Sequence, residues 1–284
     1  NFSELLREPR LLAALDHPNI VSITTAEKQE NVFFIVMEYV EGHTLDDVIT
    51  ERNGLEPAVA LDYALQISLA VDHAHRQGVI HRDLRPPNVL VSDTGVLKVA
   101  DFGTSRFLEI AAHGTTVIGS PAYMAPEQFD GKAVFASDLY SLGVMMYQML
   151  TGMLPYDAPT PGDLGRLRRG ELVSPPRLKK PSIPKAFNDI VMKAMSPDLQ
   201  NRYQRASDLL NDLETSQPTT KSKTLPSQTA GQAVASQDGD GSREARNIQS
   251  RLRAQATPEA KFCWHCHKPL HARTDRCPFC SEIQ

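Results

Sequence analysis

Apolar residues recur along the first 214 positions at helical spacing in some stretches and as short continuous runs in others. Residues 2–15 have roughly helical spacing, although Pro9 interrupts it. Two strand-like runs follow, residues 20–26 and 32–40, with a polar turn between them. We therefore expect one helix and then two strands in this part of the chain.

A long amphipathic helix is predicted after residue 56. Pro57 can open it, and Gly78 stands where the residue after a C-cap is expected. A shorter helix that ends at Gly54 precedes it, and two short strands flank the turn at residues 93–95. The buried stripe of the long helix consists of Val59, Tyr63, Ile67, Ala70, Val71 and Ala74.

Another apolar helix is predicted to end at Gly152. Either Ser137 or Asp138 can cap its N-terminus. Its apolar face consists of Leu139, Leu142, Met146, Met149 and Leu150. Further helices are expected near residues 187–195 and 206–213.

The composition changes after residue 214. Ser, Thr, Gln, Gly and Asp dominate residues 216–242, and large apolar side chains are almost absent. Such a segment cannot bury enough apolar surface to offset the entropy of ordering. We therefore predict a disordered linker at residues 215–259.

All four cysteines lie beyond this linker, as two CxxC pairs: Cys263, Cys266, Cys277 and Cys280. Four thiolates at this spacing can surround one Zn²⁺ ion tetrahedrally. Cysteines confined to one short segment fit a metal site in a reducing compartment better than a disulfide framework. We predict a four-cysteine zinc ribbon at residues 260–284, acting as a docking or regulatory module, with nucleic-acid binding as the alternative.

The overall composition narrows the classes of protein. Apolar residues make up 41% of the chain and charged residues 23%, which is ordinary for a globular protein. The net charge of −4 argues against a protein whose main partner is nucleic acid. No apolar run is long enough to span a membrane, and no signal peptide is recognisable. We expect a cytoplasmic location.

Three short motifs carry the candidate chemistry. HRDLRPPN begins at His81, DFG begins at Asp101, and APE ends at Glu127. Phosphoryl transfer needs a carboxylate directed at the attacking hydroxyl and oxygen ligands for metal ions across the phosphates. In this order and spacing, the three motifs resemble those of the protein kinase family.

The resemblance covers residues 1–214 and implies an α+β, protein-kinase-like fold. The C-lobe would be complete and mainly helical, and the N-lobe partial, with one helix and two strands. By resemblance, Asp83 is directed at the acceptor hydroxyl, and Asn88 and Asp101 hold Mg²⁺ beside ATP. Arg85 departs from the family, in which Ser/Thr-directed members usually have Lys at this position. A planar guanidinium therefore takes the place of a compact ammonium as the cation that contacts phosphate.

The nucleotide site is expected on the N-terminal side of these motifs. By resemblance, Glu8 is the helix glutamate that pairs with a strand lysine, and Met37 backs the adenine pocket. Glu38 and Val40 would offer backbone groups to adenine. No glycine-rich loop occurs before His81. We therefore expect an N-terminally truncated kinase that is weak or inactive alone; the alternative is a pseudokinase scaffold that presents the zinc ribbon.

The segment between DFG and APE indicates the substrate class. Its end, GSPAYMAPE, resembles that of kinases directed at Ser and Thr in protein substrates, and the short insertions and the metal module suggest a bacterial-like member. Thr115 or Thr116 is expected to be phosphorylated in trans through self-association, with Arg82 as cationic partner. The hydroxyl of Ser120 would steady Asp83.

Three further residues are expected to be structural. His81 would pack beneath Phe102 rather than act as acid or base. Glu127 would need a buried cation, for which Arg202 is the candidate. Asp138 would brace the HRD loop from below.

Overall fold

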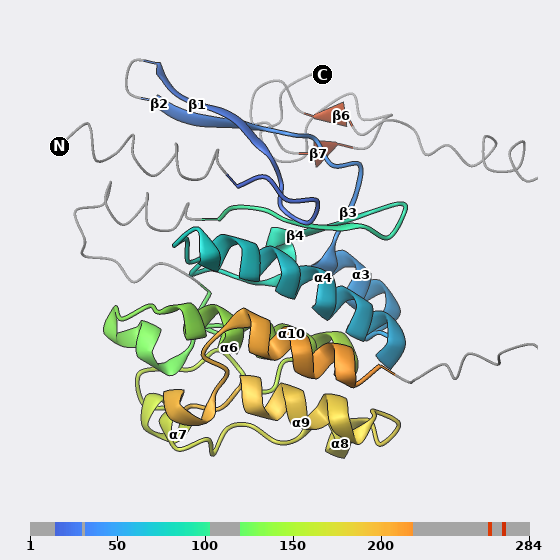
Figure 1. Cartoon of the computed structure of the whole chain (residues 1–284), viewed down its shortest axis with the longest axis vertical. Helices are drawn as coiled ribbons and strands as arrows, with labels where there is room; N and C mark the ends of the chain where they lie inside the picture. The colour runs from blue at the N-terminus through green and yellow to red at the C-terminus, as the bar shows by residue number, and fades with distance from the viewer. Residues whose placement is uncertain (1–14, 30–31, 103–119, 218–260, 263–268, 271–284) are drawn as a thin grey trace, which may run out of the picture. The chain divides into compact units, whose positions relative to one another are not determined.

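A computed structural model of the chain describes residues 15–29, 32–102, 120–217, 261–262 and 269–270 (Figure 1). The chain divides into two units, residues 1–220 and 221–284. The helices and strands, in chain order, are β1 (Ile23–Gln29), β2 (Val32–Met37), β3 (Gly42–Thr44), α3 (Leu45–Arg52), α4 (Pro57–Arg76), η1 (Pro86–Asn88), β4 (Val89–Ser92), β5 (Leu97–Val99), η2 (Pro126–Asp130), α6 (Phe135–Thr151), α7 (Leu164–Arg168), α8 (Pro176–Lys179), α9 (Lys185–Ala194), η3 (Leu199–Asn201), α10 (Ala206–Thr215), β6 (Lys261–Phe262) and β7 (Pro269–Leu270).

β1 and β2 form an antiparallel hairpin. The first predicted strand covered residues 20–26, but β1 begins three residues later, at Ile23. The reason is tertiary pairing: Ile20 bridges to Val99, and the amide of Val21 donates to the carbonyl of Val99 over 2.9 Å. These residues therefore attach the hairpin to β5 instead of extending it.

β3, β4 and β5 form a second antiparallel sheet, in that order. The turn between β4 and β5 lies at the residues predicted from the sequence. β3 begins at Gly42, whose φ is +149°. A Cβ there would lie 2.1 Å from the carbonyl oxygen of Val91, so only glycine allows β3 to pair closely with β4. Pairing with β3 and β5 on either side holds β4, the strand that directly follows the HRDLRPPN segment.

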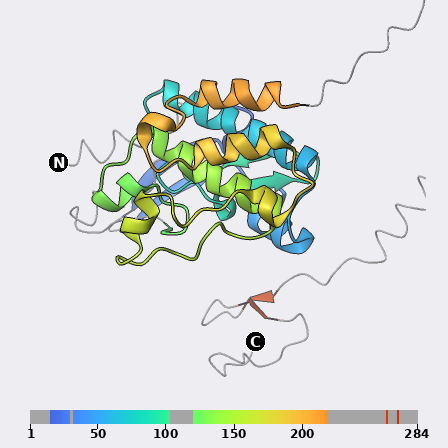
Figure 2. The same cartoon turned by 90° about the horizontal axis from the view of Figure 1, so that it is seen from below.

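α4 has the ends that the sequence predicted. Pro57 is in its first turn, and Gly78 follows the C-cap with φ +76°. The predicted stripe is buried except for Val59, which is partly buried. α4 therefore presents one apolar face to the rest of the helices, and α10 packs alongside it (Figure 2).

α6 is buried on nearly every side, and its start differs from the prediction. The N-cap is Val134, not Ser137 or Asp138. Ser137 lies three residues inside, where its hydroxyl accepts a hydrogen bond from the Val134 amide over 3.0 Å. Asp138 faces the HRD loop instead. Gly152 ends the helix, as predicted.

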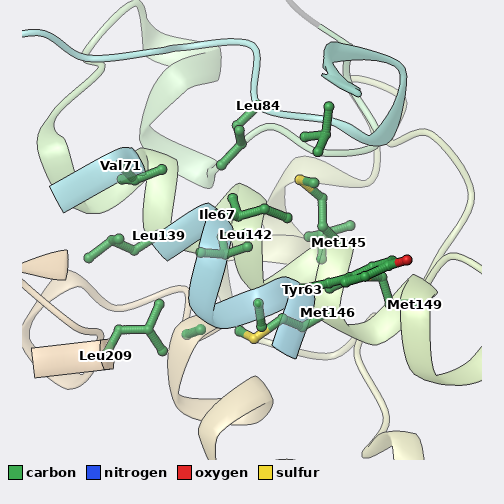
Figure 3. Packing of buried hydrophobic residues seen from close by; sticks show 14 of the residues in the cluster. Tyr63, Ile67, Val71, Leu84, Leu139, Leu142, Met145, Met146, Met149 and Leu209 are labelled. Atoms are coloured by element: carbon green, nitrogen blue, oxygen red, sulfur yellow. The ribbon is translucent and has the colours of Figure 1, made fainter. Parts of the chain in front are cut away.

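One core joins α4, α6 and α10. Figure 3 shows side chains of all three helices meeting, with Leu84 of the HRD loop pointing into the same cluster. Leu84 is fully buried, so the loop that carries Asp83 is anchored by its own apolar residue. The labelled side chains are Tyr63, Ile67, Val71, Leu84, Leu139, Leu142, Met145, Met146, Met149 and Leu209.

The predicted helices near residues 187–195 and 206–213 are confirmed as α9 and α10. In the second unit, β6 pairs with β7 in an antiparallel manner. The helix predicted at residues 2–15 lies outside the described residues, as does most of the predicted linker. Within the described part of the chain, no helix is both long and apolar enough to cross a membrane.

Candidate active site

The loop between α4 and β4 brings Asp83 and Asn88 together. The Asn88 amide nitrogen donates to the backbone carbonyl of Asp83 over 2.8 Å and to its carboxylate oxygen Oδ2 over 3.2 Å. Asn88 itself is buried at the end of η1. Because its nitrogen is directed at Asp83, the amide oxygen is the atom of Asn88 with the chemistry to ligate a cation.

Asp101 follows β5 and lies beside this loop. The amide of Ala100 donates to the carbonyl of Asn88 over 2.9 Å, which joins the two segments. Asp101 has φ +61°, a left-handed conformation that is uncommon for a residue with a side chain. A carboxylate and an amide oxygen on adjoining loops form a donor set that suits Mg²⁺. The structure thus joins the two segments that carry the predicted metal ligands, Asn88 and Asp101.

Arg85 keeps a positive charge next to Asp83. Its Nε lies 3.4 Å from Oδ2 of Asp83. The same Nε has no hydrogen-bond partner, so this contact is an ion pair by distance and not an aligned hydrogen bond. The guanidinium therefore keeps donors that are not used by Asp83.

The segment before η2 also contacts Asp83. The backbone amide of Ser120 donates to Oδ1 of Asp83 over 3.0 Å. The sequence predicted that the Ser120 hydroxyl would make this contact, whereas the contact in the structure comes from the main chain. With Asn88 on Oδ2, both carboxylate oxygens of Asp83 accept hydrogen bonds, which fixes the orientation of the group.

His81 is a packed residue, as predicted. Its ring is completely buried and lies 4.7 Å from the ring of Phe102, centroid to centroid. Its Nε2 lies 2.9 Å from the carbonyl oxygen of Ala100. His81 thus joins the HRD loop to the residue that precedes Asp101.

Asp138 braces the HRD loop, as predicted. Its two oxygens accept hydrogen bonds from the amides of His81 and Arg82, each over 2.9 Å. Sequence reasoning missed the third partner, His75, whose Nε2 lies 2.8 Å from Oδ2. Burial alone would raise the pKa of Asp138, but the His75 contact and the His81 amide outweigh it and lower that pKa.

Glu127 and Arg202 form the predicted buried pair. Two guanidinium nitrogens of Arg202 lie 2.7 and 3.1 Å from the two carboxylate oxygens of Glu127. Burial tends to raise the pKa of Glu127, and the hydrogen bonds from Arg202 and from Ser137 over 2.7 Å outweigh it, so the pKa is lowered. The ion pair attaches the APE segment to the segment between α9 and α10.

On the nucleotide side, Met37 and Asp101 line the same small hollow, together with Ile35 and Phe102. The place of Met37 behind an adenine site stays a prediction. The amide of Glu38, however, donates to the carbonyl of Ser22 over 2.9 Å, so it is engaged by the neighbouring segment.

The side chain of Glu38 has a role that the sequence did not reveal. It accepts hydrogen bonds from Lys98 over 2.8 Å and from the Ser22 amide over 2.7 Å. Burial raises the pKa of Glu38, but these contacts outweigh it and lower the pKa. Lys98 lies on β5, distant in sequence from Glu38, so no local spacing could have indicated the pair.

Several predicted residues lie outside the part of the chain that the structure describes. They are Glu8, Thr115, Thr116, Cys263, Cys266, Cys277 and Cys280. Val40 is described and half-buried after β2. Among the described residues, no three His, Cys, Asp or Glu side chains are grouped as metal ligands.

Comparisons with known proteins agree with this geometry. The family model "Protein kinase domain" matches residues 1–220. The chain is 38% identical to the serine/threonine-protein kinase PrkC of Bacillus subtilis, over 74% of the chain and 33% of that protein. It is 35% identical to the serine/threonine-protein kinase PknB of Mycobacterium tuberculosis, over 73% of the chain and 34% of that protein.

A probable serine/threonine-protein kinase of Clostridium perfringens is 40% identical, over 73% of the chain and 31% of that protein. The chain therefore spans about a third of the length of these curated relatives. Among solved structures, the crystal structure of Rad53 1-466 in complex with AMP-PNP matches with a TM-score of 0.63 and 28% identity. That match covers 73% of the chain and 53% of Rad53 1-466.

Proposed function

This chain belongs to the protein kinase family, and we propose that it acts as a serine/threonine protein kinase. ATP is the proposed donor, and Ser or Thr hydroxyls of protein substrates are the proposed acceptors. One observation carries the proposal: Asp83, Asn88 and Asp101 are held together by the Asn88 side chain and by the hydrogen bond from the Ala100 amide to Asn88.

Each of these residues has its own role in the proposed phosphate transfer. Asp83, fixed through both oxygens, accepts the proton of the acceptor hydroxyl. Asn88 and Asp101 would hold Mg²⁺, which supplies positive charge against the phosphate oxygens when bound. Arg85 adds a guanidinium charge beside Asp83. Asp138 and His81 hold the loop that carries these groups.

The relatives support the Ser/Thr specificity, since PrkC and PknB are both serine/threonine-protein kinases. The test is transfer of labelled phosphate from ATP to a Ser/Thr peptide library by the full-length protein. Asp83→Asn and Asp101→Asn should each lower the rate by at least about a hundredfold. The control, Asp93→Asn, changes an exposed carboxylate in the β4–β5 turn and should keep the rate. Equal rates for Asp83→Asn and wild type would contradict the proposal.

We propose a lower activity for residues 1–284 on their own than for the full-length protein. The sequence has no glycine-rich loop before His81, and such a loop covers the nucleotide phosphates in protein kinases. The measurement is phosphate transfer by the two proteins at equal concentration. Equal turnover would refute this proposal, and no turnover by the full-length protein would favour the pseudokinase alternative.

Separate experiments test the proposed phosphorylation sites and the proposed location of the protein. Phosphorylation at Thr115 or Thr116 by a second copy of the chain is proposed from their place between DFG and APE. Mass spectrometry of active protein would detect it, and its dependence on protein concentration would show transfer in trans. A cytoplasmic location is proposed with the kinase function and is checked by fractionation.

We propose a four-cysteine zinc ribbon at residues 260–284, supported by the two CxxC pairs. Elemental analysis of the purified chain should find one zinc per chain. Cys263→Ser with Cys280→Ser should remove it, whereas the double change His267→Ala with His271→Ala should leave it. Zinc content that follows the histidines instead would contradict the assignment of all four ligands to cysteine.

A further inference from the structure

A second hollow lies away from the active site, between the C-terminal end of α4 and the first residues of α6 and α10. Its volume is about 330 Å³. We propose that it binds a small, flat aromatic acid and that this ligand acts on the catalytic loop. The proposal rests on the side chains that line the hollow and on one of them, His75, that connects it to the loop.

Two aromatic rings form one wall of the hollow. The ring of Phe135 lies 4.8 Å from the ring of His75, tilted by 54°. Phe135 is 39% exposed although it is a large apolar side chain. An aromatic ligand would cover that exposed face and stack against the pair. Exposed apolar surface beside a hollow is therefore the first feature that indicates a ligand.

His75 contributes a polar atom that lacks a partner. The side chain is only 9% exposed, and its Nε2 is directed at Asp138. Its other nitrogen, Nδ1, is buried and has no hydrogen-bond partner. Buried polar atoms are normally satisfied, because an unmet hydrogen bond in the interior is unfavourable. A ligand hydroxyl that reaches Nδ1 would supply the missing partner.

Two arginines lie at the rim of the hollow. Arg76 is 72% exposed on α4, and Arg205 is 75% exposed just before α10. Each has a carboxylate neighbour, Asp72 at 2.6 Å and Asp208 at 2.7 Å. A guanidinium has five N–H donors, so these contacts leave donors for an anion. Asp72 also lines the hollow, whereas Asp208 does not.

Two side chains, His75 and Asp138, would connect a ligand at this position to the catalytic loop. His75 contacts Asp138. Asp138 in turn accepts hydrogen bonds from the backbone amides of His81 and Arg82, the two residues that precede Asp83. A shift of His75 changes the hydrogen bonds of Asp138 and hence the loop. The binding part of this inference is independent of kinase activity, whereas the effect on catalysis rests on the proposed function.

The binding test uses the 284-residue chain and 3-hydroxy-2-naphthoate, which carries an aromatic plane, a hydroxyl and a carboxylate. We expect saturable binding by calorimetry. Its neutral amide, 3-hydroxy-2-naphthamide, should bind about tenfold more weakly or worse, because it loses a charge-assisted contact. The double variant Arg76→Ala with Arg205→Ala should weaken naphthoate binding at least about tenfold.

Arg169→Ala is the matched control. Arg169 is an exposed arginine with its own carboxylate partner, Glu171, and it does not line the hollow. It should keep wild-type affinity. Absence of saturable binding, or equal binding of naphthoate and naphthamide, would overturn the proposal. So would an equal loss of affinity in the control and the double variant.

The coupling test is the NMR signal of selectively ¹⁵N-labelled histidine and arginine. A naphthoate concentration that just saturates wild type should shift the backbone amides of His81 and Arg82 in wild type and shift them less in the double variant. Unshifted amides in a protein with the ligand bound would overturn the coupling. Loss of kinase activity in the full-length protein, with binding and amide shifts intact, would contradict the proposed function and leave this inference standing.

Discussion

Arg202 holds Glu127 through two hydrogen bonds, one to each carboxylate oxygen, and its guanidinium side chain is completely buried. The same group donates to the carbonyls of Ser196, Pro197 and Ala136. A fully satisfied guanidinium of this kind fixes three separate segments to one point. The segment that ends the APE motif is thereby held to the start of α6 and to the residues just before η3.

Replacing Arg202 by Met should destabilise the fold by about 3–5 kcal/mol, because Glu127 would remain buried without its cation. Urea unfolding followed by circular dichroism measures the change. Arg205→Met is the matched control, since Arg205 is exposed and forms a surface pair with Asp208; its unfolding midpoint should not move. If Arg202→Met were as stable as wild type, the ion pair between Arg202 and Glu127 would not be what holds the APE segment in place.

Gly143 of α6 should not tolerate a larger residue. A Cβ there would lie 2.8 Å from Cγ of Met195 and 2.9 Å from Cβ of Ala194, against α9. Gly143→Ala should therefore destabilise the protein by about 1–3 kcal/mol, although alanine favours helix. Gly165→Ala on α7 is the control. Its Cβ would meet only the flexible end of Arg169 at 3.4 Å, so stability should hold or rise slightly. The comparison is made by thermal unfolding, and equal effects would refute close α6–α9 packing.

The Asn19 side chain should contribute to the attachment of the β1–β2 hairpin. Its Nδ2 donates to the carbonyl of Leu97 over 2.8 Å and to Oε1 of Gln66 over 3.0 Å, and the residue is buried. Asn19→Ala should destabilise the protein by about 1–3 kcal/mol because the buried carbonyl of Leu97 loses this donor. It should also speed amide exchange at Val21. Asn211→Ala, at an exposed position, should do neither; a similar response in both variants would contradict this role.

Acid should weaken the brace under the catalytic loop. The pKa of Asp138 is lowered in the folded protein, so on acidification the unfolded chain takes up the proton first. The stability from this group is complete above the unfolded pKa, about 3.9, and is lost as the pH falls through that value towards the folded pKa. Urea unfolding between about pH 6 and 3 should show a shallower loss for Asp138→Asn than for wild type. Parallel curves would show that Asp138 is not the titrating group.

Local patterns determined much of the secondary structure. Pro57 begins α4, Gly78 follows its C-cap and Gly152 ends α6, because the fixed φ of proline and the positive φ that glycine adopts are properties of the residue itself. The start of α6 was predicted wrongly for the opposite reason. Ser137 and Asp138 are good N-cap residues by type, but Asp138 is engaged by the HRD loop and Ser137 by Glu127. Tertiary partners decided the boundary.

The candidate site shows the same division. Order and spacing of HRDLRPPN, DFG and APE were enough to name Asp83, Asn88 and Asp101, since those residues must be adjacent for the chemistry to work. The partners of Asp83 and Glu38 were not all predictable. The Ser120 contact is made by a main-chain amide, and Lys98 lies 60 positions from Glu38. A local sequence pattern does not show which residues far apart in the chain come into contact.

By itself, the sequence determined which residue types are available for phosphoryl transfer, where several helices end, and that a cysteine-rich segment follows. Those properties are local, because they depend on backbone conformation and on short spacings. Only the tertiary structure decided that His75 supports Asp138, that Asn19 attaches the hairpin, and that a hollow lies beside His75. These depend on packing between residues far apart in the chain, where burial changes the energy of every polar contact.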